Sequence, residues 1–259
     1  MAIGLVGYGR FGRLAAGFLA RHATVVVHDR RAPVSRRGRI RPGSLREAAS
    51  QRVVILAVPV SALRPALHSL APVVRPGALV LDVSTVKSRP VEWMKAILPP
   101  SVGILGTHPL FGPDSVGRTL RGHSIVLTPV RISAIRLRRI TSLLRQRGLR
   151  VVIMTPERHD RMVAETILLT HYLGRLVHYA RLRRWKPATA SYGKLLSVID
   201  VATNDSLQLL QDVWAYNPYS RSLEKALRLS RRRLAELLRR PAASSRSSGR
   251  TRVAARTHG

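Results

Sequence analysis

The chain of 259 residues contains no cysteine, which excludes disulfide bonds and cysteine-ligated metal ions. It has no apolar run near the roughly 18–20 residues that a membrane-spanning helix needs. No charged leader with a cleavage site precedes the first apolar residues, so we do not expect a signal peptide. These absences predict a cytoplasmic protein without disulfides, without a resident metal and without contact with a membrane.

Lysine, acidic and aromatic residues are scarce, whereas arginine is abundant. Lys+Arg number 45, only five of them lysine, against 13 Asp+Glu, so the formal net charge is +32. A charge of this size can indicate binding to nucleic acid. However, the arginines are spread over the whole chain, and aromatic residues at 5% leave few rings to stack on bases. We interpret the arginine excess as a compositional bias and do not expect a nucleic-acid partner.

The first 29 residues have the order strand, glycine turn, helix, strand. An apolar strand over residues 3–8 leads into Gly7-Tyr-Gly-Arg-Phe-Gly12, a helix over 13–21 follows, and a second strand over 24–28 ends at Asp29. This order is the context that a GxGxxG dinucleotide-binding fingerprint requires.

Each residue of the glycine turn has a predicted role toward a dinucleotide. Gly7 permits the tight turn, Gly9 lets backbone amides approach the pyrophosphate, and Gly12 lets helix and strand pack closely. The partial positive charge of the helix N-terminus attracts the phosphates. We expect Arg10 and Phe11, which lie in this turn, to contact the cofactor as well.

Asp29 indicates which cofactor is bound. Its carboxylate is placed to accept hydrogen bonds from the ribose hydroxyls of NAD. Arg30 and Arg31 follow it and keep NADP possible, because a guanidinium can hold the 2′-phosphate. Val58 and Pro59, which end a later strand, are also expected beside the cofactor.

The alternation of strands and helices continues to residue 156. Continuous apolar strands are expected over 53–59, 79–83, 102–105, 124–128 and 151–155, with helices over 61–70 and 133–148. This pattern predicts an α/β fold with a doubly wound parallel sheet of the Rossmann type over residues 1–156. Helices are then expected over 158–183, 192–216 and 221–239, which predicts a helical domain over 157–240. By analogy with other small helical domains, we expect it to dimerise and bury its apolar faces. Residues 241–259, rich in Ser, Ala, Arg and Gly, predict a disordered basic tail.

The segment Gly106-Thr-His-Pro-Leu-Phe-Gly-Pro-Asp114 carries the strongest indication of chemistry. We expect a rigid loop here, in which Pro109 fixes His108 just beyond the carboxyl edge of the sheet. A single imidazole in that place can take the proton of a substrate hydroxyl in a dehydrogenase. Thr85 and Lys87 follow the preceding strand and should lie at the same edge.

Together these motifs resemble those of the prephenate and arogenate dehydrogenases. The resemblance covers about residues 1–225 and rests on the glycine turn, Asp82-Val-Ser-Thr-Val-Lys87, the His108 segment, His159-Asp-Arg-Met-Val-Ala164, Leu169-Thr-His-Tyr-Leu-Gly-Arg175 and Asn217-Pro-Tyr219. It implies a Rossmann domain followed by a helical dimerisation domain, and a homodimer. It also implies NAD- or NADP-dependent oxidation of a cyclohexadienol at C4, with loss of CO2 as the ring becomes aromatic, in tyrosine biosynthesis. Prephenate, arogenate and 4-amino-4-deoxyprephenate all remain open as the substrate.

The resemblance also implies roles for individual residues. The family histidine that binds the C4 hydroxyl falls on His108, and the family serine after the strand falls on Thr85. Asp114 and His171 fall on substrate-binding positions. The family arginine that binds a carboxylate falls on Lys194, which keeps the charge but loses the bidentate fork.

Two other classes of function stay open. Another two-domain Rossmann oxidoreductase would be expected to carry a catalytic lysine on the first long helix after the sheet, but no lysine lies between Arg158 and Arg184. A basic nucleic-acid-binding protein on a Rossmann scaffold would show salt-dependent binding to DNA.

Overall fold

The computed structural model describes residues 2–239. The chain divides into two compact units, Met1–Leu223 and Glu224–Gly259. The predicted basic tail over 241–259 lies outside the described residues. Within the described part of the chain, no helix is long and apolar enough to cross a membrane. The cytoplasmic location stays a prediction.

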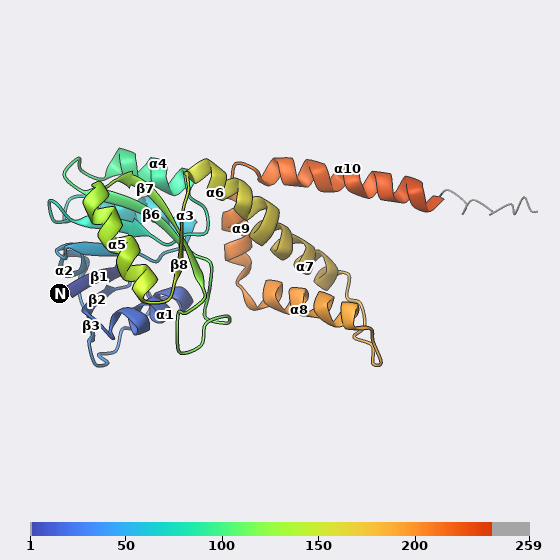
Figure 1. Ribbon diagram of the computed structural model, residues 1–259, viewed down its shortest axis with the longest axis horizontal. Coiled ribbons are helices and arrows are strands. Elements are labelled where there is room, and N and C mark those ends of the chain that lie inside the picture. Colours follow the sequence, from blue (N-terminus) through green and yellow to red (C-terminus); the bar gives the residue numbers. More distant parts are fainter. Residues whose placement is uncertain (1, 240–259) are drawn as a thin grey trace, which may run out of the picture. The chain divides into compact units, whose positions relative to one another are not determined.

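An eight-stranded sheet forms the centre of the first unit (Figure 1). Its strands are β1 (Ala2–Val6), β2 (Thr24–His28), β3 (Ile40–Pro42), β4 (Val53–Leu56), β5 (Leu79–Asp82), β6 (Gly103–Pro109), β7 (Ser124–Arg131) and β8 (Arg150–Ile153), in the order 3-2-1-4-5-6-7-8. β1 lies between β2 and β4, so the chain changes direction across the sheet at this point. Ligands of doubly wound folds bind at such a switch point, beyond the carboxyl ends of the strands.

The predicted α/β class and doubly wound sheet are confirmed, with one correction. β7 runs antiparallel to β6, with Val126 opposite His108, whereas a wholly parallel sheet was expected. The chain from β6 to β7 contains no crossover helix, because residues 110–123 are loop and turn, and an antiparallel return needs none.

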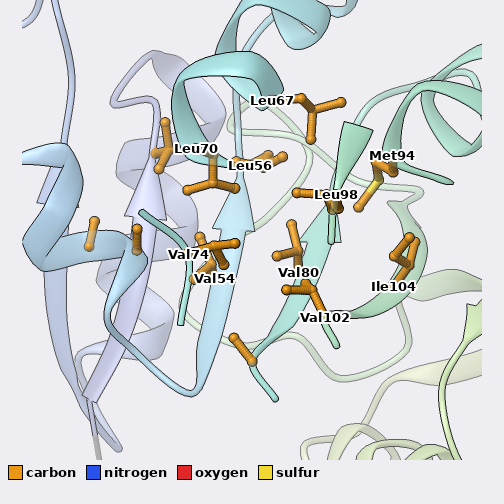
Figure 2. Packing of buried hydrophobic residues seen from close by; sticks show 14 of the residues in the cluster. Val54, Leu56, Leu67, Leu70, Val74, Val80, Met94, Leu98, Val102 and Ile104 are labelled. Atoms are coloured by element: carbon orange, nitrogen blue, oxygen red, sulfur yellow. The ribbon is translucent and has the colours of Figure 1, made fainter. Parts of the chain in front are cut away.

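Helices cover both faces of the sheet. On one face α2 (Leu45–Ala49), α3 (Val60–Leu70) and α4 (Ser88–Ile97) pack on the strands, with Leu67 and Leu70 of α3 and Met94 of α4 in the core (Figure 2). On the other face α1 (Arg10–Leu19) packs on β1 and β2, and α5 (Ala134–Gln146) packs near β6, β7 and β8. This double covering explains why the strands are apolar on both faces.

Three short elements have no counterpart among the predicted ones: β3, α2 and α4. α2 depends on a local signal, because the Ser44 hydroxyl accepts from the backbone N–H of Glu47 and the Glu47 carboxylate accepts from that of Ser44. Its five residues are too few for an apolar period to show. The helix expected over 13–21 begins earlier, at Arg10.

Helices follow the last strand, as expected. These are α6 (Pro156–Val163), a π-helical turn (Ala164–Leu168), α7 (Leu169–Tyr179), α8 (Ala190–Asn204), α9 (Leu207–Tyr216) and α10 (Ser220–Arg239). The single helix expected over 192–216 is two helices. The chain is extended at Asp205, and Ser206 caps the N-terminus of α9 by accepting from the N–H of Leu209.

Helices after the last strand share an apolar cluster with the sheet region. Val163, Leu168 and Val213 pack in one cluster with Val60 of α3 and Val86, which lies between β5 and α4. This shared cluster joins α6 and α9 to the sheet region and keeps residues up to 223 in one compact unit. The division at residue 156 coincides with the end of the strands and stays a prediction.

Candidate active site

The glycine turn has the close packing that its sequence predicts. Gly7 has φ +102°, and a Cβ there would lie 2.4 Å from the carbonyl oxygen of Ala57. A Cβ on Gly12 would lie 2.2 Å from the carbonyl oxygen of Gly7. A Cβ on Gly9 would meet nothing within 4 Å, so that glycine leaves open space beside the first turn of α1. The space is available to a ligand.

The N-terminus of α1 is free to bind an anion. Its N-cap residue is Gly9, and no side chain caps the first-turn amides. Such amides carry partial positive charge and favour phosphate. Arg10 adds a guanidinium at the same point, and the Phe11 ring lies 6.5 Å from that of Phe111, which follows β6.

A pocket of about 390 Å³ opens beside this turn. Five of the predicted cofactor residues are among those that line it: Gly7, Asp29, Arg30, Val58 and Pro59. They follow β1, β2 and β4, so the pocket lies at the switch point of the sheet. Its position and lining fit the adenosine half of a dinucleotide.

Asp29 is fixed by the backbone around it. Its carboxylate accepts N–H bonds from Tyr8 at 2.6 Å and from Arg31 and Ala32 at 2.7 Å. Burial opposes ionisation of Asp29, but these three bonds outweigh it and lower its pKa. The side chain is therefore an oriented anion at the pocket, able to accept from ribose hydroxyls.

His108 lies in a strand and not in a loop, which corrects the sequence interpretation. It is the sixth residue of β6, pairs with Val126 of β7, and is only 5% exposed. Pro109 ends the strand, and the loop begins after it. The ladder with β7 therefore fixes the backbone of His108 more firmly than a proline-bounded loop would.

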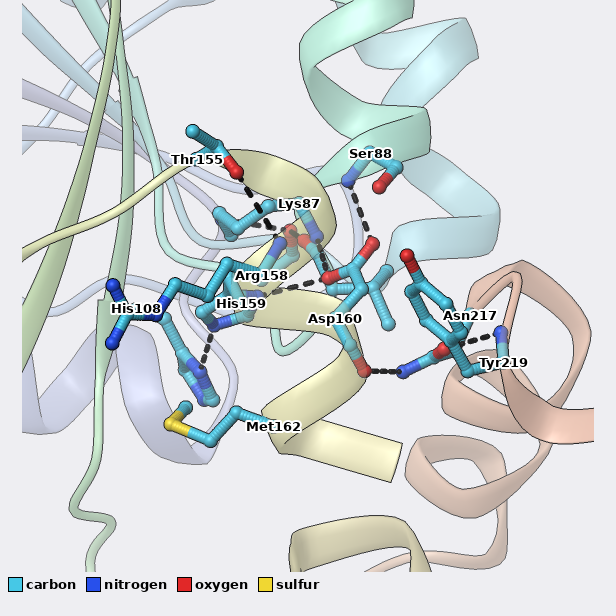
Figure 3. Close-up of polar contacts among 12 residues, drawn as sticks. Lys87, Ser88, His108, Thr155, Arg158, His159, Asp160, Met162, Asn217 and Tyr219 are labelled. Carbon is cyan, nitrogen blue, oxygen red and sulfur yellow. Dashed lines mark hydrogen bonds and ion pairs between the residues drawn. The ribbon is translucent and has the colours of Figure 1, made fainter. Parts of the chain in front are cut away.

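A chain of hydrogen bonds runs from His108 into α6 (Figure 3). Nδ1 of His108 lies 2.9 Å from Nε2 of His159, and Nδ1 of His159 lies 2.9 Å from Oδ1 of Asp160. The side chains of His159 and Asp160 are fully buried. The imidazole rings of His108 and His159 are nearly perpendicular, with an angle of 74° between their planes. Residues that are 51 positions apart in the sequence thus form one polar array.

Asp160 is held from both ends. Its two carboxylate oxygens accept from the backbone N–H groups of Lys87 and Ser88 at 2.7 and 2.8 Å, where α4 begins. Its backbone carbonyl accepts from the Asn217 side chain at 2.8 Å. A carboxylate at a helix N-terminus is stabilised by the helix dipole. The array is therefore anchored to α4 and to the end of α9.

A buried ion pair lies behind His108. Nζ of Lys87 donates to the carboxylate of Asp82 and to the backbone carbonyl of Thr107, the latter at 2.7 Å. Both charged side chains are completely buried. A Cβ on Gly106 would lie 3.3 Å from Cδ of Lys87, so that glycine leaves room for the lysine stem. Removing one partner of such a pair costs roughly 3–5 kcal/mol, so Lys87 and Asp82 stabilise the junction of β5, β6 and α4.

Burial controls the protonation of the array. It lowers the pKa of His108 well below the usual 6.5, and the positive charges that His159 and Lys87 can carry add to this effect. Burial also lowers the pKa of His159, although the bond to Asp160 opposes it. Burial opposes ionisation of Asp160, but the bonds from His159, Ser88 and Lys87 lower its pKa overall. At neutral pH the array is two neutral imidazoles and one carboxylate.

Comparisons with known proteins show the family of this chain. A family model described as "Prephenate dehydrogenase, nucleotide-binding domain" matches residues 35–153. The chloroplastic arogenate dehydrogenase 2 of Arabidopsis thaliana is 30% identical over 242 residues, which are 88% of this chain and 67% of that protein. The chain belongs to the prephenate and arogenate dehydrogenase family. The resemblance inferred from the sequence motifs is confirmed.

Two further members of the family show the range of relatives. The 4-amino-4-deoxyprephenate dehydrogenase of Streptomyces pristinaespiralis is 34% identical over 130 residues, 50% of this chain and 42% of that protein. The structure of prephenate dehydrogenase from A. aeolicus in complex with hydroxyphenyl propionate and NAD+ has a TM-score of 0.72 at 21% identity. The matched region covers 92% of this chain and 90% of the A. aeolicus chain. The chain spans only 39% and 36% of the length of two other curated relatives.

Of the family residues expected at the substrate, Asp114 and His171 belong to one chain of ion pairs that runs through Arg10 and Asp205. Thr85 lies in the turn after β5, half-buried. Asp114 bonds to Arg10, and His171 of α7 is buried, with Nε2 3.5 Å from the Asp205 carboxylate. Burial lowers the pKa of His171, although Asp205 opposes this. Lys194 is exposed on α8 and makes no hydrogen bond or ion pair within the described residues.

His159, Asp160 and Asn217 lie in the family motifs, but the sequence alone predicted no role for them. A signal was present, because His159 and Asp160 are adjacent titratable residues near the start of an expected helix, within a motif on which the resemblance rests. Asp205, which contacts both Arg10 and His171 at 3.5 Å, was not singled out at all. It falls inside the single helix expected over 192–216 and carries no motif of its own.

Proposed function

We propose that this enzyme catalyses the NAD-dependent oxidative decarboxylation of prephenate, or of a close analogue such as arogenate, in tyrosine biosynthesis. One observation carries the proposal. His108, neutral and buried, lies near the carboxyl end of β6, and the nucleotide pocket opens at the carboxyl ends of β1, β2 and β4 of the same sheet. Since these strands are parallel, base and cofactor site share one edge.

The residues at the pocket fit NAD. Asp29 is an oriented anion for ribose hydroxyls, and the uncapped amides of α1 and Arg10 suit a pyrophosphate. When bound, the nicotinamide accepts a hydride. Arg30 and Arg31 line the same pocket and keep NADP possible. The NAD+ in the A. aeolicus relative supports the assignment.

His108 is suited to take the proton of the C4 hydroxyl. The hydroxyl proton moves to the imidazole as the hydride leaves C4, and the C–O bond becomes a carbonyl. Loss of CO2 then returns an electron pair to the ring oxygen, and the imidazolium gives its proton back to that oxygen. Because a neutral imidazole must accept first, the lowered pKa of His108 favours the reactive state. Thr85, with a hydroxyl at the same edge, is proposed to orient the substrate.

The substrate carries carboxylates, which need cationic partners. We assign this role to Lys194 and place His171 and Asp114 at the substrate as well, on the strength of the family motifs. The 34% identity to a 4-amino-4-deoxyprephenate dehydrogenase favours that substrate as a second candidate. The test is formation of NADH from NAD, or of NADPH from NADP, with prephenate, arogenate and 4-amino-4-deoxyprephenate. Turnover of none of the three would overturn the proposal.

We propose further that the enzyme is a homodimer through its helical region. Leu173, Leu176 and Tyr179 of α7 are 39%, 55% and 64% exposed, and Val201 of α8 is 54% exposed. Large apolar side chains grouped in this way favour burial against another protein surface. Leu176→Asp should shift the mass in light scattering from dimer to monomer. The matched control is Ile135→Asp, because Ile135 is 58% exposed on α5, in the sheet region. A monomeric wild type would contradict the proposal.

A further inference from the structure

The hydrogen-bond chain that ends at Asp160 has one consistent arrangement of protons. An ionised carboxylate only accepts, so Nδ1 of His159 carries the hydrogen that bonds to Asp160. A neutral His159 then has its lone pair on Nε2. The partner at 2.9 Å, Nδ1 of His108, must therefore donate to it.

This arrangement determines the free nitrogen of His108. With Nδ1 protonated, a neutral His108 has its lone pair on Nε2. No hydrogen bond from the described residues involves Nε2 of His108. The nitrogen left for the substrate is thus the one that can accept a proton. With the opposite tautomer Nε2 would be a donor, and a base at that position would be lost.

We propose that His159 and Asp160 are positioning residues that hold His108 in the Nδ1–H tautomer and stabilise the imidazolium formed during oxidation. The proposal rests on the proposed function for the identity of the reaction, but not for the tautomer. When Nε2 gains the hydroxyl proton, the Nδ1–H bond to His159 becomes a charge-assisted bond. His159 can share the positive charge because Asp160 lies at its far nitrogen.

Charged groups on neighbouring elements make this support necessary. Lys87, on the loop that enters α4, disfavours a positive charge on His108, and its partner Asp82 ends β5. Asp160 supplies the opposite charge from α6, and the N-terminus of α4 holds it there through Lys87 and Ser88. Without the His159–Asp160 pair, a positively charged His108 would be buried with no acceptor for its Nδ1–H bond.

The first test is the tautomer itself, measured by 15N NMR of the wild-type enzyme labelled in histidine. The expected spectrum at neutral pH shows both His108 and His159 as Nδ1–H tautomers, with assignments from the spectra of His108→Asn and His159→Gln. An Nε2–H tautomer of His108 would overturn the proposal. This measurement needs no substrate, so it stands even if none of the three candidate substrates is turned over.

The second test separates positioning from structural support. His159→Gln keeps an amide oxygen that can accept from Nδ1 of His108, whereas His159→Leu keeps bulk and loses the acceptor. With melting temperatures showing both variants folded, we expect His159→Leu to lose roughly 100-fold in kcat. We expect His159→Gln to recover at least tenfold of that loss, and the KM for NAD to stay within about twofold in both. Equal kcat for the two folded variants would contradict the proposal. If His159→Leu does not fold, the tautomer measurement decides.

Discussion

Nη2 of Arg10 lies 2.7 and 2.8 Å from the two carboxylate oxygens of Asp114. Arg10 begins the helix at the predicted pyrophosphate site, and Asp114 follows the strand of His108, 104 residues later. The pair thus joins the predicted cofactor site to the segment after β6, which the family motif places near the substrate. Both side chains are about half exposed, at 50% and 52%, so the pair contributes little to stability, roughly 0–1 kcal/mol.

The pair should instead influence cofactor binding. Asp114→Asn removes the nearer of the two carboxylates beside Arg10, so we expect the Kd for NAD to fall about threefold to tenfold at low salt. The effect should shrink as salt screens the guanidinium. Fluorescence titration with NAD at two salt concentrations measures it, with Arg10→Gln as the opposite case that weakens binding. A Kd for NAD that rises in Asp114→Asn would show that Asp114 is needed to hold Arg10 in place.

His108→Asn should affect turnover more than any other single change. Asparagine keeps polarity and similar bulk but cannot take the proton, so kcat should fall roughly 10²–10⁴-fold. The KM for NAD should stay nearly unchanged, since the pocket does not include His108. Steady-state kinetics of the two enzymes provides the measurement, and a variant with near wild-type kcat would remove His108 from the mechanism.

The pH profile should report the same group. A base works when it is deprotonated, and burial lowers the pKa of His108 well below 6.5. The wild-type kcat/KM for the substrate, which reports groups of the free enzyme, should therefore be level through neutral pH and fall only on acidification below pH 6.5. The residual activity of His108→Asn should lack this acid limb. An acid limb of the wild type above pH 7 would show that another group controls the rate.

Asp29→Asn should shift cofactor preference toward NADP. The substitution removes the charge that repels a 2′-phosphate, while the amide oxygen can still accept N–H bonds from the turn that holds Asp29. Arg30 and Arg31 then lie at the pocket without an opposing carboxylate. We expect the ratio of kcat/KM for NAD to that for NADP to fall about tenfold. A wild type that already prefers NADP would contradict this interpretation of Asp29.

Lys194→Ala tests the assignment of the substrate carboxylate. A charge-assisted bond to a carboxylate contributes roughly 1.5–3 kcal/mol, so the KM for the substrate should rise about tenfold or more. The KM for NAD should not change. Lys186→Ala is the matched control, since Lys186 is another exposed lysine of the helical region. Equal substrate KM values in the two variants would exclude Lys194 from the site.

Local sequence determined the nucleotide-binding side of this protein. Gly7 has a positive φ, a Cβ on Gly12 would clash with Gly7, and Asp29 accepts N–H bonds from residues two and three positions later, so these roles follow from the local chain. The positions of most strands also followed from apolar runs, because strands buried on both faces need apolar residues throughout. These features depend on short stretches of chain, so a pattern of residue types is enough to predict them.

The surroundings of His108 were decided by the tertiary structure. The sequence indicated the histidine itself, but placed it in a loop, because it cannot show that β7 returns antiparallel and extends β6 to Pro109. Nor can it show that His159, on a helix 51 residues later, lies 2.9 Å from His108, or that the N-terminus of α4 binds Asp160. Sequence fixes which groups are present, but the distance between groups far apart in the chain depends on how helices and strands pack. Since hydrogen bonds and pKa values depend on those distances and on burial, only the folded chain determines which nitrogen of His108 is free to act.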